Sequence, residues 1–409
     1  MDKKKIFNDP VYGFITIPNK NIYDIVEHPY FQRLRRIRQL GLTDMVYPGA
    51  LHTRFHHALG AMHIMSKALD TLRNKGVMIF EAEYEAALIA ILLHDIGHGP
   101  FSHTLEFSLF KKVNHEQISL WIFNVLDRTF KGKLELAKQI FTGKYHRKFL
   151  HQLVSSQLDA DRLDYLRRDC FFTGVLEGTI GTERIIEMLN VVNDNLVVEE
   201  KGIYSIENFL NARRLMYWQV YLHKTAVSAE SMLISLMKRA KKLTQDGHEV
   251  QATPALKIFL EQDIDVKEFE KDGDLLDVFA MLDDTDIWGS IKFWLHHDDM
   301  VLQKLSRALL SRNLFRIDLS NEKIQKSETQ RIRTEIVKQW KISENEATYF
   351  CQQGSISNSA YIAKGESIKI LTKSGDVVDV ASAADLPNIK AMSKIVKKFY
   401  LSYPKNISL

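Results

Sequence analysis

Hydrophobic residues recur every three or four positions along most of the chain from about Ile22 onward, which is the pattern of amphipathic helices. In the predicted helix over residues 54–74, Phe55, Leu59 and Met62 fall on one face. The same spacing predicts further helices, over residues 28–40, 82–96, 115–128, 133–143, 147–157, 160–169, 182–191 and 205–243.

Alternating patterns are confined to three short segments. Residues 5–18, which contain Pro10 and Gly13, predict a strand or hairpin. Residues 195–206 predict a small hairpin that turns at Lys201–Gly202, and residues 366–383 predict another around Ser374–Asp376.

These elements predict a mainly α fold with a small N-terminal β element and a smaller α+β C-terminal region. We expect the helical core to span residues 1–310 and the C-terminal region residues 311–409, with the boundary between 310 and 345.

Composition narrows the class of protein. The chain has 409 residues, of which 45% are hydrophobic and 26% charged, as in ordinary globular proteins. The net charge of +4 suits a phosphate-bearing ligand and does not argue for nucleic-acid binding. No segment resembles a membrane span or a signal peptide, and Cys170 and Cys351 make no disulfide framework, so we expect a reducing, cytoplasmic setting.

Candidate chemistry concentrates in residues 92–103, LLHDIGHGPFSH, where an apolar helix ends in His94 and Asp95. Adjacent residues on a helix point about 100° apart, so they converge on one ion only near a helix end. A His–Asp pair alone is weak, because His297–Asp298 also follows an apolar segment, and we interpret that second pair as a solvated helix end.

Further ligands must come from distant segments. His57 stands on an apolar helix, where the alternative is a hydrogen-bonded core histidine. Asp161, Tyr165 and Asp169 share one helix face, where the alternative is an N-cap on a salt-bridged surface helix. Two histidines with two carboxylates leave coordination positions open, which favours Fe, Mn, Ni or Mg over a closed structural zinc site.

A basic and phenolic stripe follows on the predicted helix over residues 205–243. Arg213, Tyr217, Tyr221 and Lys224 are spaced to share one side of a helix. Cations suit phosphates and rings suit a sugar or base, whereas the alternative is an ordinary amphipathic helix rim.

Several motifs in fixed order resemble one family, the HD-superfamily deoxynucleoside triphosphate (dNTP) triphosphohydrolases of animals and bacteria. The resemblance covers about residues 1–230. It rests on FQRLRRIRQLGLTDMVYPGALHTRFHHALG (31–60), LLHDIGHGPFSHTLE (92–106), NHEQ (114–117), DADRLDYLRRD (159–169) and YLHK (221–224).

The resemblance implies an HD-domain helical core, with its motifs over about 50–170, and one divalent metal. The metal would be Mn, Fe or Mg, with Ni or Zn as alternatives, and further Mg would accompany the nucleotide. The implied metal ligands are His57, His94, Asp95 and Asp161. The implied catalytic residues around the scissile phosphate are His98, His103, Glu106 and His115. The implied substrate-binding residues are Gln39, Leu40, Arg54, Arg162, Tyr165, Asp169, Arg213, Tyr217, Tyr221 and Lys224.

Within that substrate set, Gln39 and Leu40 would lie against the deoxyribose, and the ring of Tyr221 would leave no room for a 2′-hydroxyl group. The resemblance also implies a nucleotide effector bound at subunit contacts, hence a homo-oligomer. The residues in effector positions are Lys5, Asn8, Glu27, Gln32, Arg35, Arg184 and Lys201.

The chain departs from the animal pattern at several of these positions. His56 replaces an acid, Glu106 and Glu27 replace aspartates, Arg162 replaces a lysine and Tyr217 replaces a histidine.

The implied reaction is the metal-dependent hydrolysis of a dNTP to deoxynucleoside and triphosphate. His103, aligned by Glu106 three residues later, or alternatively His115, would protonate the 5′-oxygen. The rival functions are an HD phosphodiesterase or phosphatase acting on a nucleoside monophosphate or a cyclic nucleotide, and a non-catalytic nucleotide sensor.

Overall fold

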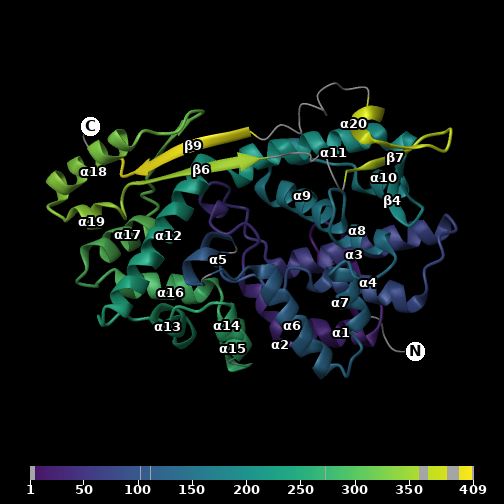
Figure 1. The fold of residues 1–409 in the computed structure, drawn as a ribbon, viewed down its shortest axis with the longest axis horizontal. Helices are drawn as coiled ribbons and strands as arrows, with labels where there is room; N and C mark the ends of the chain where they lie inside the picture. The colour runs from purple at the N-terminus through teal and green to yellow at the C-terminus, as the bar shows by residue number, and fades with distance from the viewer. Residues whose placement is uncertain are drawn as a thin grey trace.

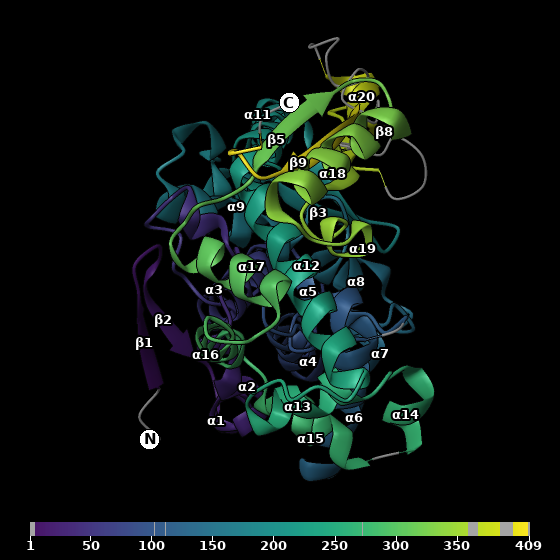
Figure 2. The ribbon, with the colours of Figure 1, turned by 90° about the vertical axis from the view of Figure 1, so that its left-hand side faces the viewer.

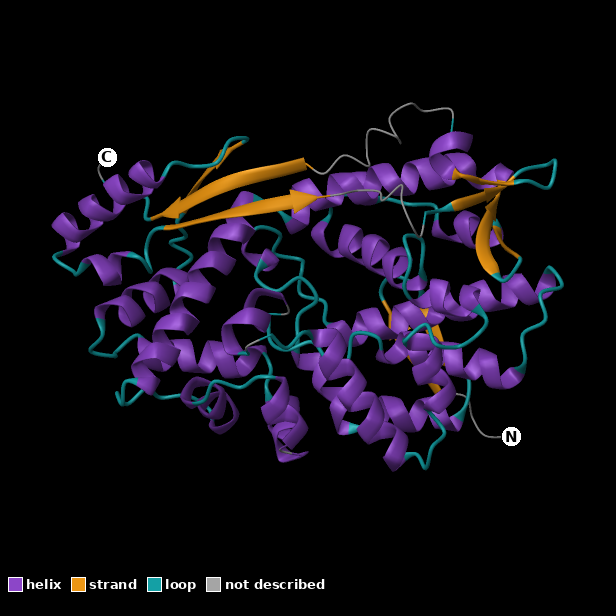
Figure 3. Cartoon of the chain, viewed as in Figure 1, coloured by secondary structure: helices purple, strands orange, loops and turns teal. Residues whose placement is uncertain are grey.

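The computed structural model describes residues 5–101, 103–110, 112–271, 273–358, 367–384 and 396–407, apart from the side chains of three residues in α5, His103, Glu106 and Phe107. Helices dominate the described chain, which confirms the predicted mainly α fold (Figure 3). Among these helices, none combines the length and the apolar composition needed to cross a bilayer.

The first half of the chain builds a helical layer around two central helices, α3 and α4. The helices of this half are α1 (Lys20–Glu27), α2 (Pro29–Gln32), α3 (Arg54–Asn74), α4 (Glu81–Leu93), α5 (His103–Leu109), α6 (His115–Thr129), α7 (Glu135–Phe141), α8 (Lys148–Val154), α9 (Ala160–Thr173) and α10 (Thr182–Glu187). Helix α4 is apolar on every side from Ala86 to Leu93, and it is buried between α3, α7 and α8 (Figure 1).

The second half packs around the long helix α12. Its helices are α11 (Ile203–Met216), α12 (Lys224–Gln245), α13 (Pro254–Glu261), α14 (Val266–Lys271), α15 (Gly273–Met281), α16 (Asp284–Trp294), α17 (Met300–Leu310), α18 (Lys326–Trp340), α19 (Glu344–Ala347) and α20 (Val380–Ala383). Helices α13 and α17 pack directly on α12.

The described strands form three small sheets. The strands are β1 (Lys5–Asp9), β2 (Gly13–Ile17), β3 (Leu189–Val192), β4 (Asn195–Glu199), β5 (Arg316–Ser320), β6 (Gln352–Asn358), β7 (Lys369–Leu371), β8 (Val377–Asp379) and β9 (Val396–Tyr403). Their orders are β1-β2, β3-β4-β7-β8 and β5-β9-β6, and β7 runs parallel to β4. The C-terminal strands therefore make one sheet of their own, β5-β9-β6, and extend the β3-β4 hairpin into a second (Figure 1).

Two of the three predicted hairpins are confirmed. Strands β1 and β2 pair from Lys5 with Ile17 to Asp9 with Gly13, and β7 pairs with β8 around the predicted turn. The turn predicted at Lys201–Gly202 is wrong, because β3 and β4 turn at Asn193–Asp194, where both residues have positive φ. The helix predicted over 182–191 ends earlier, at Glu187, because the chain enters strand β3 at Leu189.

Two predicted helices are interrupted. Within 28–40, the helical conformation ends after a 3₁₀ turn at Arg36, because the backbone N–H groups of Arg38 and Gln39 bond to Asp284 Oδ2 (2.9 Å) and His52 O (3.0 Å). The predicted helix 205–243 is broken by a π turn at residues 217–221 and by the extended backbone of His223.

Candidate metal centre and active site

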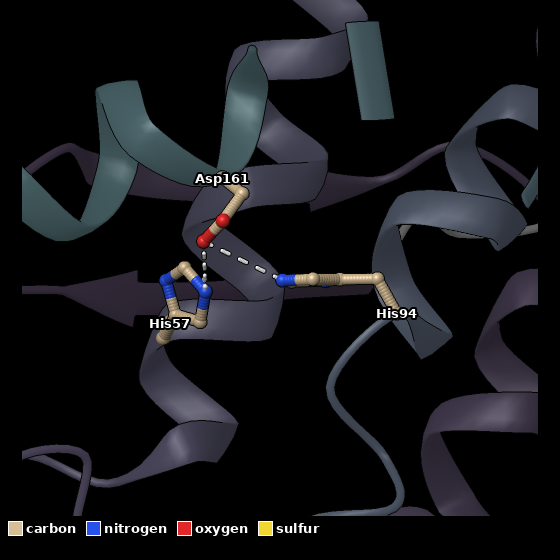
Figure 4. A group of neighbouring side chains, drawn as sticks. All are labelled: His57, His94 and Asp161. Carbon is tan, nitrogen blue, oxygen red and sulfur yellow. Dashed lines mark ion pairs between the residues drawn. The ribbon is translucent and has the colours of Figure 1, made fainter. Parts of the chain in front are cut away.

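Three helices bring two histidines and two carboxylates together. His57 comes from α3, His94 and Asp95 from the end of α4, and Asp161 from the first turn of α9. Figure 4 shows His57, His94 and Asp161 pointing toward one another. Asp161 Oδ1 lies 3.1 Å from His57 Nε2 and 3.5 Å from His94 Nε2. Asp95 Oδ1 lies 3.4 Å from His94 Nε2, and its Oδ2 lies 3.8 Å from His57 Nε2.

Both imidazole rings are held by their outer nitrogens. His57 Nδ1 donates to Asp164 Oδ2 (2.7 Å), and His94 Nδ1 donates to Ile91 O (2.6 Å). These bonds orient the rings so that each Nε2 atom points toward the cluster. Both Nε2 atoms are buried and face the Asp161 carboxylate. His57, His94 and Asp161 thus offer donor atoms that lie close enough together to hold one divalent cation.

The electrostatics of the cluster point the same way. Burial alone would lower the pKa of His57, but hydrogen bonding to Asp161 and Asp164 raises it to about 10. Burial would raise the pKa of Asp161, yet His57 and His94 hold it well below its usual range. At neutral pH the carboxylates therefore favour the protonated form of His57. The same negative field attracts a metal ion, whose binding would release that proton.

The N-cap of α9 decides one alternative left open by the sequence. Asp159, rather than Asp161, caps the helix by accepting from Arg162 N (2.8 Å), and its other oxygen accepts from Ser156 N in the preceding loop (2.7 Å). The Asp161 carboxylate is therefore available to the histidine cluster. The second His–Asp pair behaves as interpreted: α16 ends at Trp294, and Asp298 is exposed beyond it.

A second group of donors adjoins the first. Asp95, His98 and His115 offer ligand atoms that lie within 4.8 Å of one another. The rings of His98 and His115 stack with centroids 3.9 Å apart. Gly97 makes this approach feasible, because a Cβ atom there would overlap the backbone of His115 in α6. His98 and His115 therefore adjoin the cluster of metal donors through Asp95.

A cavity of about 600 Å³ opens from this cluster. The predicted metal, catalytic and substrate residues that line it are Gln39, Leu40, Arg54, Asp95, His98, His115, Asp161, Arg162, Tyr165, Asp169, Tyr217 and Tyr221. His57 and His94 are outside this lining, but both face Asp161, which belongs to it. One cavity therefore joins the metal donors to most of the predicted nucleotide-binding groups.

Two arginines flank the metal donors. Arg54, at the start of α3, is buried and pairs with Asp95, and Arg162 pairs with Asp159. Burial lowers the pKa of Arg54, whereas for Arg162 the opposing effect of Asp159 outweighs burial and raises the pKa. Both arginines line the cavity beside the metal donors.

The other two predicted cations lie apart from this lining. Arg213 is buried, and in the described structure its Nε and Nη1 atoms make no hydrogen bond. Its guanidinium carbon lies 5.9 Å from the centroid of the Tyr217 ring. Lys224 is exposed at the start of α12, beyond the break in the predicted helix, so the predicted four-residue stripe does not form.

Hydrogen bonds and ring contacts fix the part of the cavity wall that contains Asp169 and Tyr221. The Tyr221 hydroxyl donates to Asp169 Oδ2 (2.7 Å), and Asp169 Oδ1 lies 2.7 Å from His52 Nε2. The rings of Tyr165 and Tyr217 pack edge-on against Tyr221 with centroids 6.0 and 5.2 Å away. The position of the Tyr221 ring is therefore fixed by several partners.

Comparisons with known proteins agree with this geometry. A family model described as the HD domain matches residues 54–166, and one described as the HD associated region matches residues 180–258. A crystal structure of a phosphohydrolase from Bacteroides thetaiotaomicron is 53% identical and superposes with a TM-score of 0.96, covering 98% of this chain and 100% of that one. The chain is an HD-domain phosphohydrolase.

Two relatives indicate which branch of the HD superfamily this chain resembles. The uncharacterized protein YwfO of Bacillus subtilis is 32% identical, over 100% of this chain and 94% of that protein. The deoxynucleoside triphosphate triphosphohydrolase SAMHD1 homolog of Dictyostelium discoideum is 30% identical, over 60% of this chain and 51% of that protein. This chain therefore spans about half the length of the Dictyostelium relative and resembles the dNTPase branch of the superfamily. Metal dependence follows from the family and from the donor groups described above.

Some predicted residues remain apart from the cavity or outside the description. The side chains of His103 and Glu106 lie outside the described part of this phosphohydrolase. Among the predicted effector residues, Arg35 bonds to Gln32 (2.8 Å), and Arg184 bonds to Lys201 O (3.2 Å). The remaining three, Lys5, Asn8 and Glu27, are exposed.

Sequence reasoning missed several residues that support the site. Asp164 and His52 hold His57 and Asp169, and both are buried. Asp164 belongs to the motif over 159–169, so the sequence offered a sign of it. Only the fold shows that Asp164 contacts His57 and that Asp169 contacts His52. Glu230 in α12 also lines the cavity, and no motif marked it.

Glu230 gives the phosphohydrolase a measurable pH dependence. Burial raises its pKa from the ordinary 4.5 to about 7, so the unfolded chain loses this proton at lower pH than the folded protein. The contribution of Glu230 to the free energy of unfolding therefore falls as pH rises from about 4.5 to 7. We expect Glu230→Gln to stabilise the protein above about pH 7, by up to roughly 3 kcal/mol, and to have little effect near pH 4.5. Urea unfolding across this range measures it.

The matched control is Glu322→Gln, at an exposed position far along the chain. Its effect on the free energy of unfolding is expected to be small and flat with pH. A Glu230→Gln profile parallel to wild type would contradict the buried-acid explanation.

Proposed function

We propose that this HD phosphohydrolase hydrolyses dNTPs to deoxynucleosides and triphosphate. The supporting observation is the single cavity that joins the histidine–aspartate cluster, two arginines, the Gln39–Leu40 pair and the ring of Tyr221. A metal cluster alone would suit many phosphate esters. Cations beside it, and an aromatic wall further along, favour a substrate with several phosphates and a sugar.

The proposed roles follow from position. His57, His94, Asp95 and Asp161 would hold the divalent cation, which supplies Lewis-acid polarisation of a phosphoryl oxygen and a lower pKa for a neighbouring water. Arg54 and Arg162 would neutralise charge on the non-bridging oxygens as water attacks the α-phosphorus.

The 5′-oxygen leaves as the P–O bond breaks, and it needs a proton. We assign that proton to His103 aligned by Glu106, with His115 as the alternative donor. His115 stacks on His98 at the cavity wall, which supports its proximity to the reacting phosphate. Wild-type turnover in both His103→Ala and Glu106→Ala would exclude the first assignment.

Product analysis tests the proposed reaction. Each dNTP is incubated alone and in pairs, with Mg²⁺ or Mn²⁺, and the products are separated by ion-exchange chromatography. Equal amounts of deoxynucleoside and triphosphate support the proposal. Orthophosphate or a linear monophosphate would favour an HD phosphatase or phosphodiesterase, and tight binding without turnover would favour a nucleotide sensor.

Discrimination against ribonucleotides is expected to depend on the Tyr221 ring. Tyr221→Ala opens space beside the sugar and should lower the ratio of kcat/KM for a dNTP to that for the matching NTP about 10- to 100-fold. Tyr221→Phe keeps the ring, loses only the hydrogen bond to Asp169, and should retain most of the ratio. Equal ratios in Tyr221→Ala and wild type would remove the ring from the specificity argument.

We further propose a nucleotide effector bound through Lys5, Asn8, Glu27, Gln32, Arg35, Arg184 and Lys201 at contacts within a homo-oligomer. Activation by a second dNTP in the paired assays, with a concurrent rise in mass by light scattering, supports this. Identical rates in single and paired assays would contradict it.

A further inference from the structure

The N-terminal hairpin is bonded to the back of the proposed metal centre through a chain of charged side chains. Asp9, the last residue of β1, accepts from Arg168 Nη1 through its Oδ2 atom (2.8 Å). Arg168 then donates to both oxygens of Asp164, from Nε and Nη2, at 3.0 Å each. Asp164 Oδ2 accepts from His57 Nδ1 (2.7 Å), which completes the chain from hairpin to predicted metal ligand.

All four members of the chain are withdrawn from water. Arg168, Asp164 and His57 are 0% exposed, and Asp9 is 6% exposed. Charges at this depth interact strongly, since solvent does not screen them. A change at Asp9 is therefore felt at His57, three bonds of the chain away.

The hairpin end of the chain is itself rigid. The second oxygen of Asp9, Oδ1, accepts from Val11 N (2.9 Å) and Tyr12 N (3.0 Å), which closes the turn between β1 and β2. The ring of Tyr12 lies 5.5 Å from the guanidinium carbon of Arg168. Asp9 thus ties the shape of the turn to the position of Arg168.

The sign of the electrostatic effect can be derived. Arg168 shares its charge between Asp9 and Asp164. Without the Asp9 charge, Arg168 attracts Asp164 more strongly, and Asp164 becomes a weaker acceptor for His57 Nδ1. When the acceptor bonded to Nδ1 of a histidine becomes weaker, the Nε2 atom of the same ring becomes a less basic metal ligand.

We propose that Asp9 is a positioning residue for the metal centre, acting through Arg168 and Asp164 on the orientation and basicity of His57. The proposal rests on the metal ligand set of the proposed function. By thermodynamic linkage, if the hairpin strengthens metal binding, then bound metal must stabilise the hairpin to the same extent. The hairpin lies at the edge of the molecule, with Phe14 70% exposed on β2, so its movement is accessible to outside contacts (Figure 2).

The first test measures Mn²⁺ binding by calorimetry in the full chain. Asp9→Asn is expected to raise the dissociation constant about 10-fold, and Asp9→Glu, which keeps the charge, to restore part of it. Asp24→Asn, which removes an exposed carboxylate paired with Lys20 at 2.6 Å, should leave it unchanged. Wild-type affinity in Asp9→Asn, even with reduced thermal stability, would overturn the proposal.

Asp161→Asn in the same titration separates the two hypotheses. If it leaves Mn²⁺ affinity unchanged, the proposed ligand set is wrong. If it weakens binding and Asp9→Asn does not, only the positioning role is wrong.

The second test starts from the wild-type protein, so its main result does not depend on a variant that must fold. Hydrogen exchange of peptides covering residues 5–17 is compared with and without Mn²⁺ in the wild-type protein. Slower exchange with Mn²⁺ is expected, and the effect should disappear in Asp9→Asn. Exchange that does not respond to Mn²⁺ in the wild type would overturn the coupling.

Discussion

Asparagine in place of Asp161 is expected to lower kcat/KM for a dNTP about 1,000-fold, equivalent to roughly 4 kcal/mol of transition-state stabilisation. Asp161 Oδ1 faces both imidazole Nε2 atoms, at 3.1 Å from His57 and 3.5 Å from His94. A neutral amide keeps the shape but removes the charge that attracts the cation. Steady-state kinetics and a parallel Mn²⁺ titration measure both consequences.

The chain contains its own control for this experiment. His297 and Asp298 repeat the dipeptide of the active cluster, but Asp298 is exposed and α16 ends before it. Asp298→Asn is expected to leave both kcat/KM and Mn²⁺ affinity at wild-type values. If Asp161→Asn behaves like Asp298→Asn, the cluster of His57, His94 and Asp161 does not hold the catalytic metal.

The second large effect is on stability, at Gly60 in α3. Replacing a glycine inside a helix with alanine ordinarily stabilises a protein by about 1 kcal/mol. At Gly60, however, a Cβ atom would overlap the carboxylate of Asp164 and the guanidinium of Arg168. Separating a buried ion pair costs about 3–5 kcal/mol. We therefore expect Gly60→Ala to destabilise the protein by about 3 kcal/mol in urea unfolding.

Gly289 provides the matched comparison. It also lies inside a helix, α16, but no heavy atom lies within 4 Å of the position of an added Cβ. Gly289→Ala is expected to raise stability by about 0.5–1 kcal/mol. Stabilisation by Gly60→Ala would show that the Asp164–Arg168 pair can move aside at little cost, and it would weaken the positioning role of Asp9 as well.

Local pattern was sufficient for much of the fold. The predicted helix over 54–74 coincides with α3, and the predicted hairpin over 5–18 contains β1 and β2. Side-chain periodicity is a local property of helices and strands, so it can be read before any tertiary contact is known. The residue types of the candidate site were equally visible, because HD and DADRLD stand at helix ends.

The convergence of these residues required the tertiary structure. The distance of 3.1 Å between His57 and Asp161 joins residues on α3 and α9, and no spacing along the chain implies it. The supporting contacts are equally remote in sequence, since Arg168 bonds to Asp9, 159 positions earlier in the chain. The ligand assignment itself stays a prediction for the Mn²⁺ titration to decide.

The sequence by itself determined the helical class, the N-terminal hairpin and the kinds of donor atom offered at the ends of α4 and α9. Only the tertiary structure decided where helices stop against their own pattern, as at Arg36 and at residues 217–221. There, backbone groups find partners from distant segments: Asp284 for Arg38 N, and Tyr47, whose hydroxyl donates to Gln219 O (2.6 Å). The physical reason is that a buried backbone group must be hydrogen-bonded, and a partner brought by another element can replace the one a helix would supply.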